Sequence, residues 1–152
     1  QPASPQTSAT VITRHTLREA ENIPHILVVD DDYVNRVLAE EMLKAVGWRV
    51  SVVEDGAQAL VLLEQEHINL VLMDMQMPIM DGYTATTKIR KKERQTGDHL
   101  PIIALTGFAF AEDREKCLAA GADEYLRKPF KPEELLATVK QHLQQAKEAK
   151  NA

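Results

Sequence analysis

Acidic side chains follow two short apolar runs of the chain, in a pattern that could bind a metal. Asp30 and Asp31 come directly after residues 26–29, and Asp74 comes directly after residues 70–73. Carboxylates that crowd together repel one another and raise one another's pKa. A hard divalent cation removes that repulsion, and sites made of carboxylate oxygens suit Mg²⁺. These residues therefore predict a magnesium site, provided that folding brings them together.

A hydroxyl and an ammonium group follow two further predicted strands, since Thr106 comes after residues 101–105 and Lys128 after residues 124–127. A carboxylate beside Mg²⁺ can attack a phosphorus atom and form an acyl phosphate. That step needs stabilisation of the charge on the phosphoryl oxygens, which Lys128 and the Thr106 hydroxyl could supply. Each residue alone has an ordinary explanation as a cap or turn residue. The combination predicts phosphoryl transfer onto Asp74.

The hydrophobic pattern predicts the elements that would position these groups. Short apolar runs indicate buried strands, and apolar residues at helical spacing indicate helices between them. The expected strands are 26–29, 49–53, 70–73, 101–105 and 124–127, and the expected helices are 33–46, 57–66, 82–95, 111–120 and 132–145. This alternation predicts an α/β fold with a parallel sheet, right-handed crossovers and helices on both faces. Ligand sites of such sheets lie beyond the carboxyl ends of the strands, where the candidate residues would meet.

Composition excludes several other classes of protein. The 152 residues are 44% hydrophobic, which is enough for one core, and the net charge of -5 argues against a nucleic-acid surface. The basic run at 88–94 is expected to be a solvated helix end. Cys117 is the only cysteine, which fits a reducing compartment, and no apolar run is long enough to span a membrane. We predict a cytoplasmic domain without membrane contact of its own, whose parent protein could be anchored in the inner membrane.

The chain divides into three predicted segments. Residues 1–23 are rich in Pro, Ser and Thr and then polar, which indicates a linker that is disordered or helical in part over 13–21. Residues 24–146 form the predicted domain, and 147–152 are a polar tail. A linker at the start suggests a domain of a longer protein.

Four stretches of the chain resemble the receiver domain of two-component response regulators. They read ILVVDDDYVNR at 26–36, LVLMDMQMPIMDGY at 70–83, PIIALTG at 101–107 and GADEYLRKPF at 121–130. They occur in order and cover the whole predicted domain, so the resemblance is specific. It implies a flavodoxin-like (βα)5 fold with the strand order 2-1-3-4-5.

The resemblance also implies a role for each residue of the acidic site. Asp74 corresponds to the phosphorylated aspartate, and Asp30 and Asp31 to the acidic pair, with Asp31 favoured as a direct Mg²⁺ ligand. The backbone carbonyl of Gln76 would be a further ligand. An isolated domain of this kind catalyses its own phosphorylation.

Further residues would form the conformational switch. Thr106 resembles the switch hydroxyl, Lys128 the phosphate-binding lysine and Tyr125 the switch aromatic residue. The bond from Lys128 to Pro129 is expected to be cis. Flanking side chains at Gln76 and Phe108 are expected to tune the lifetime of the phosphoryl group.

The resemblance implies that the domain accepts a phosphoryl group from a phosphohistidine in a His-Asp phosphorelay. We expect no output domain after the last helix, and the form DMQMPIMDG favours the C-terminal receiver of a hybrid histidine kinase. The partner would be a histidine kinase core or a histidine phosphotransfer domain, which would dock on residues 33–46 through Val34 and Val37. A stand-alone regulator is the second interpretation, and a pseudo-receiver that only binds proteins is another. A phosphatase of the dehalogenase type is disfavoured because Gln76 stands where that family needs an acid.

Other residues are expected to be structural. Gly82 is interpreted as allowing a tight turn into a helix, and Asp32 as the N-cap of the first helix. The methionines around Asp74 are interpreted as packing and not as a copper site; these are Met73, Met75, Met77 and Met80. The histidines are expected to be solvated; these are His15, His25, His67, His99 and His142.

Overall fold

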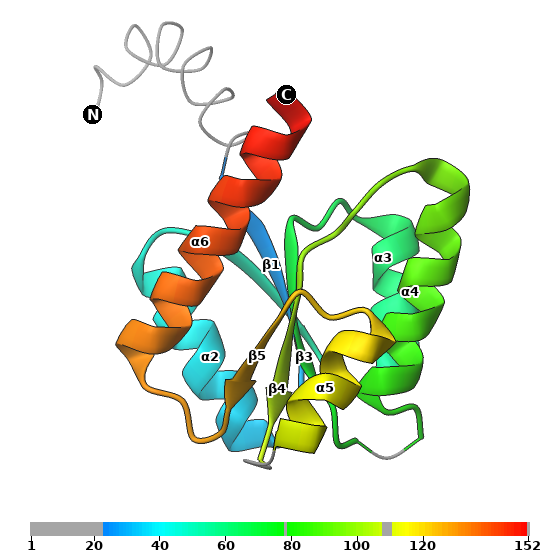
Figure 1. The fold of residues 1–152 in the computed structure, drawn as a ribbon. Coiled ribbons are helices and arrows are strands. Elements are labelled where there is room, and N and C mark those ends of the chain that lie inside the picture. Colours follow the sequence, from blue (N-terminus) through cyan, green and yellow to red (C-terminus); the bar gives the residue numbers. More distant parts are fainter. Residues whose placement is uncertain (1–22, 78, 108–110, 152) are drawn as a thin grey trace, which may run out of the picture.

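The computed structural model describes residues 23–77, 79–107 and 111–151. The predicted linker up to residue 22 and the prediction for Phe108 lie outside these residues. A five-stranded parallel sheet in the order β2-β1-β3-β4-β5 forms the centre of the molecule (Figure 1). The strands are β1 (His25–Val29), β2 (Arg49–Val53), β3 (Leu70–Asp74), β4 (Ile102–Thr106) and β5 (Glu124–Arg127). The predicted fold class and strand order are confirmed.

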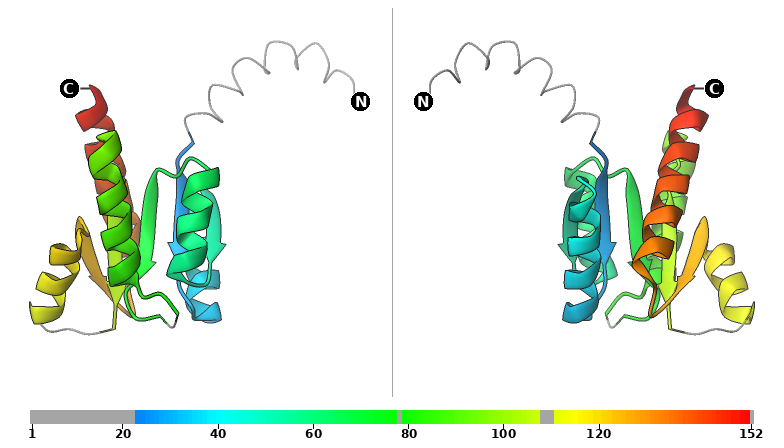
Figure 2. Two further views of the ribbon diagram at one scale, coloured as in Figure 1. Left: turned by 90° about the vertical axis from the view of Figure 1, so that its right-hand side faces the viewer. Right: turned by 90° about the vertical axis from the view of Figure 1, so that its left-hand side faces the viewer.

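Helices cover both faces of the sheet. They are α2 (Tyr33–Ala45), α3 (Gly56–Gln65), α4 (Gly82–Thr96), α5 (Ala111–Ala120) and α6 (Pro132–Asn151). Figure 1 looks at the sheet edge-on, with α2 and α6 on one side and α3, α4 and α5 on the other. The two views of Figure 2 show these helical layers face-on, α3, α4 and α5 in the left view and α2 and α6 in the right view.

The core consists of two apolar clusters, one on each face of the sheet. Strands β1, β3 and β4 are buried along their whole length, which is typical of parallel strands covered on both sides. One cluster packs under α3, α4 and α5 and includes Cys117. The other packs under α2 and α6 and includes Leu43, Leu135 and Val139. Met73, Met75 and Met77 are buried in the first cluster and Met80 packs against it, so the prediction that these methionines are packing residues is confirmed.

Helix α6 is longer than the sequence suggested. We expected it to end near residue 145 and to be followed by a polar tail, but it continues to Asn151. The added residues Ala, Lys and Glu are good helix formers, and the Gln144 amide donates to Glu148 one turn later at 3.1 Å. Polarity by itself therefore does not end a helix. No helix of the described residues is both long and apolar enough to cross a bilayer.

A polar network ties the amino ends of β4 and β5 to α4, and it corrects the prediction of a solvated basic run at Arg90 alone. The other basic residues of that run are exposed as predicted; these are Lys88, Lys91, Lys92 and Arg94. The Arg90 side chain is only 12% exposed and forms ion pairs with Glu93 at 2.6 Å and Asp123 at 2.8 Å. It also donates to the Gly121 carbonyl at 2.8 Å, and His99 Nε2 lies 2.6 Å from Asp123 Oδ1. We call Arg90, Glu93, His99 and Asp123 the Arg90 network.

Two histidines are buried, so the prediction that they are solvated was wrong. His25 lies in β1 with its Nε2 2.7 Å from Ser51 Oγ. His142 lies on α6 with its Nε2 3.5 Å from the Glu124 carboxylate. Each imidazole has a polar partner, Ser51 for His25 and Glu124 for His142, and such a partner lowers the cost of burying a polar ring. His67 and His99 are exposed as expected.

Candidate phosphoacceptor and metal site

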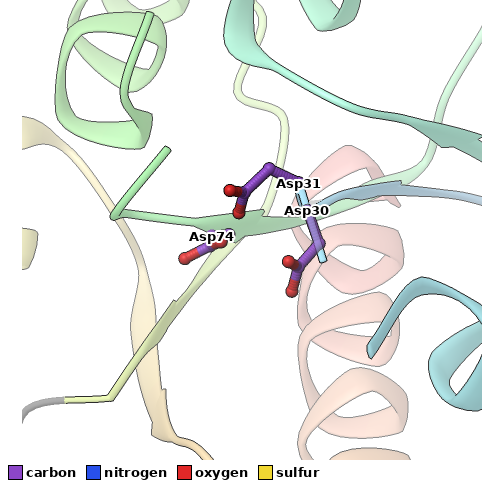
Figure 3. Close-up of side chains that lie close together, drawn as sticks. All are labelled: Asp30, Asp31 and Asp74. Carbon is purple, nitrogen blue, oxygen red and sulfur yellow. The ribbon is translucent and has the colours of Figure 1, made fainter. Parts of the chain in front are cut away.

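Parallel pairing of β1 with β3 brings the acidic residues together at the carboxyl end of the sheet. Val29 is paired with Met73, so Asp30 and Asp74, the residues that follow, lie next to each other. Carboxylate oxygens of Asp30, Asp31 and Asp74 lie within 4.8 Å of one another (Figure 3). Asp30 and Asp74 are almost fully buried, at 1% and 2% exposure, whereas Asp31 is exposed. The cluster is therefore accessible to solvent at Asp31.

Lys128 is the cation that faces the buried carboxylates. It follows β5 directly, and its backbone N–H donates to the Thr106 carbonyl at 2.7 Å. Its Nζ lies 2.8 Å from Asp30 Oδ2 and 3.3 Å from Asp74 Oδ2. The Lys128–Pro129 peptide bond is cis, as predicted. One ammonium group is thus shared between two buried carboxylates.

The electrostatics of the site leave negative charge to be compensated. Burial, and then the neighbouring charge of Asp30, raise the pKa of Asp74 to about 7, although Lys128 and the Gln76 N–H act in the opposite direction. Burial alone would lower the pKa of Lys128, but its hydrogen bond to Asp30 and the charge of Asp74 outweigh burial and raise it. Lys128 is therefore charged at neutral pH, and a further cation would stabilise the ionised form of Asp74.

Thr106 and Gln76 lie beside the candidate nucleophile. Thr106 is the last residue of β4, and its Oγ1 donates to Gln76 Oε1 at 3.3 Å. The Gln76 backbone N–H donates to Asp74 Oδ1 at 3.1 Å. Sequence reasoning named the Gln76 carbonyl as a metal ligand but missed this contact of its side chain with the candidate switch hydroxyl. Tyr125 lies on β5, half-buried against the cluster under α3, α4 and α5.

Three other acids near the strand ends are helix caps and not part of the cluster. The Asp32 carboxylate accepts from the backbone N–H groups of Val34 and Asn35, which confirms its predicted N-cap role. The same role belongs to Asp55 at α3 and Asp81 at α4. Capping accounts for these carboxylates, so the structure separates them from the candidate metal ligands.

Gly82 has a different role from the predicted turn. Its φ is not in the left-handed region, so no turn conformation requires glycine there. A Cβ at this position would collide with the Asp74 carbonyl oxygen and would lie 2.7 Å from Met75 Sδ. Glycine is needed because the first turn of α4 packs directly on the backbone of Asp74.

Comparison with known proteins agrees with this geometry. The chain is 44% identical over 104 residues to the sensor histidine kinase RcsC of Escherichia coli, which covers 68% of this chain and 10% of that kinase. It is 40% identical over 119 residues to the probable transcriptional regulator ycf27 of Cyanophora paradoxa, covering 78% of this chain and 48% of the regulator. The chain thus spans from about a tenth to half the length of these relatives.

A solved structure and a family model also match receiver domains. The receiver domain of the sensor histidine kinase PA1611 from Pseudomonas aeruginosa, which has a magnesium ion coordinated in its active site cleft, superimposes with a TM-score of 0.72 at 43% identity. The match covers 80% of this chain and 98% of that domain. The model of the response regulator receiver domain matches residues 26–140. The chain belongs to the response regulator receiver domain family.

Proposed function

We propose that this domain is the phosphoacceptor of a His-Asp phosphorelay and takes the phosphoryl group onto Asp74. The observation that carries the proposal is the position of Asp74, which is buried beside Asp30, Asp31 and the ammonium group of Lys128. A carboxylate held in this way is oriented on one side by the Gln76 N–H and on the other by Lys128.

The residues present fit a magnesium ion. The cluster consists of hard oxygen donors, and its buried carboxylates share one cation, so a divalent ion would remove the remaining like-charge repulsion. Asp30, Asp31, Asp74 and the backbone carbonyl of Gln76 would hold it. When bound, Mg²⁺ supplies positive charge beside Asp74 and the phosphoryl oxygens. The magnesium ion in the related PA1611 receiver supports this assignment.

The proposed reaction moves one phosphoryl group from nitrogen to oxygen. A carboxylate oxygen of Asp74 attacks the phosphorus atom of a phosphohistidine, and a P–O bond forms as the P–N bond breaks. The electron pair of the P–N bond stays on the imidazole nitrogen, which takes up a proton. Lys128 Nζ, 3.3 Å from Asp74 Oδ2, lies where it neutralises charge on the phosphoryl oxygens.

The phosphorylated site would draw Thr106 away from its present partner. Its hydroxyl now donates to the neutral Gln76 side chain, and a phosphoryl oxygen on Asp74 is a stronger, charged acceptor. We infer that Thr106 changes partner on phosphorylation and that Tyr125, on the neighbouring strand β5, turns inward.

The proposed phosphodonor is a histidine kinase core or a histidine phosphotransfer domain, and the proposed parent is a hybrid histidine kinase. The similarity to receivers of sensor kinases supports this context. The start of α2 follows the acidic pair and exposes Tyr33, Val34 and Leu38, which offers an apolar surface beside the pocket.

Labelling with acetyl phosphate tests the assignment of Asp74. We expect the full chain to be phosphorylated only with Mg²⁺ present and Asp74→Asn to remain unlabelled with its circular dichroism spectrum unchanged. Asp55→Asn is the matched control, because Asp55 caps a helix outside the cluster. Equal labelling of Asp74→Asn and the unmodified chain would refute the assignment.

A further inference from the structure

The loop between β3 and α4 carries a residue in an unusual state. Ile79 has a φ of 69°, in the left-handed region, and its side chain is 88% exposed. A β-branched residue with positive φ is a genuine outlier, because its Cβ lies too close to the backbone. Glycine or asparagine adopts this conformation at lower cost.

Described residues on both sides of Ile79 make contacts with the rest of the domain. Met77 before it is buried in the core cluster. After it, the Met80 carbonyl accepts from the Gly56 N–H at 3.2 Å, and Asp81 caps α4. These contacts constrain the chain before and after position 79. A residue that adopts positive φ at lower cost should leave the stability of the fold unchanged or raise it.

The exposed Ile79 side chain gains no stability from packing inside this domain. The positive φ and the exposure of an apolar side chain are therefore both unfavourable, and neither has a structural benefit. Strained residues that persist in this way are commonly found at functional sites. The loop that carries Ile79 begins after Asp74 and lies at the carboxyl end of the sheet (Figure 1). The exposed apolar residues Tyr33 and Val34 begin α2 at the same end, directly after the acidic pair.

We propose that Ile79 is a docking contact for the protein phosphodonor and selects donors with an apolar surface beside their phosphohistidine. The inference rests on the proposed function. It adds that the side chain at position 79 affects phosphoryl transfer from protein donors but not from small-molecule donors. A small donor such as acetyl phosphate enters the pocket without reaching this loop, so it should be insensitive to the side chain at position 79.

The test compares two donors on the full chain. The protein donor is the one that labels the unmodified chain fastest among a panel of histidine-phosphorylated kinase cores and phosphotransfer domains. We expect Ile79→Asn and Ile79→Gly to slow this transfer about tenfold, as the loss of one well-packed contact would. Labelling by acetyl phosphate should stay the same, and the Tm should stay the same or rise. Ile79→Val keeps an apolar side chain and should restore transfer.

Val61→Asn is the matched control, because Val61 is another exposed aliphatic residue, on α3. It should transfer at the unmodified rate. Equal rates from the protein donor for Ile79→Asn and the unmodified chain would overturn the inference, and so would a parallel loss of labelling by acetyl phosphate or a clear fall in Tm. Failure of every phosphohistidine donor to label the unmodified chain would instead count against the proposed function.

Discussion

Two groups of carboxylates lie at opposite ends of the sheet and differ in how completely their charges are compensated. In the Arg90 network, Asp123 Oδ2 accepts from Arg90 and from the Ile102 N–H, and Glu93 Oε2 accepts from the Leu100 N–H. In the acidic cluster, one ammonium group serves both Asp30 and Asp74. The first arrangement joins elements of the fold, whereas the second leaves charge that a cation or a phosphoryl group can use.

The comparison shows that the role of a buried carboxylate depends on which groups donate hydrogen bonds to it. Arg90 provides three donated contacts in a fixed planar geometry, to Glu93, Asp123 and Gly121. Lys128 offers a compact charge that can follow a moving acceptor. The four predictions below test this difference, in order of decreasing effect.

Loss of the arginine should have the largest effect on stability. Arg90→Met leaves Glu93 and Asp123 without their cation in a poorly exposed place, and we expect a loss of about 2–3 kcal/mol in the free energy of unfolding. Urea denaturation measures it. The control is Lys92→Met on the same helix, whose ion pair with Glu64 is exposed and should matter by less than about 0.5 kcal/mol. Similar losses for both variants would show that the network is not structural.

Magnesium should stabilise the acidic cluster by a comparable amount. At about a hundredfold excess over Kd, binding to the folded chain raises the free energy of unfolding by about 2.7 kcal/mol. We expect this rise in the unmodified chain and in Arg90→Met, but not in Asp74→Asn. Thermal unfolding with MgCl₂ or EDTA checks it. The same rise in Asp74→Asn would place the ion elsewhere.

The metal-free chain should lose stability as pH rises, because of Asp74. Its pKa of about 7 in the folded state lies above the ordinary value of 3.8, so the folded chain holds a proton that the unfolded chain releases. The contribution of Asp74 to stability should therefore be fully present below about pH 4 and be lost as pH rises to about 7. Asp74→Asn removes this fall and should be more stable by at least about 1 kcal/mol above pH 7. Tm measured against pH in EDTA tests this, and parallel curves for both chains would contradict it.

Loss of the histidine should have the smallest effect. His99 is 59% exposed, and Asp123 keeps Arg90 and the Ile102 N–H when the imidazole is absent. We expect His99→Gln to lower the free energy of unfolding by less than about 1 kcal/mol. A loss as large as that of Arg90→Met would mean that the imidazole is essential to the network. Urea denaturation of the two variants side by side decides between these outcomes.

The fold and the position of the acidic cluster could be predicted from sequence because both follow from the order of the elements. Asp30, Asp74, Thr106 and Lys128 each end or follow a strand, and parallel strands place their carboxyl ends at one edge. The order of the elements is therefore enough to predict where the acidic cluster lies. The roles of these residues in catalysis and switching remain predictions.

The Arg90 network could not be predicted because its members come from unrelated parts of the chain. Arg90 and Asp123 are 33 positions apart, on a helix and in a turn, and no spacing links them. The basic run around Arg90 indicated a solvated surface, since polarity does not reveal that one of its residues points inward. The contact of Gln76 with Thr106 was missed for a similar reason, because side-chain partners depend on the register of packed elements.

The close packing of Gly82 on the backbone of Asp74 has a consequence for mutational libraries of this domain. Because a Cβ would overlap the Asp74 carbonyl oxygen, position 82 should accept only glycine, whatever property the library is selected for. Position 74 should behave in the opposite way, since a screen for folded protein admits asparagine and a screen for phosphorylation does not. Two such screens compared position by position would therefore separate the residues that build this pocket from those that react in it.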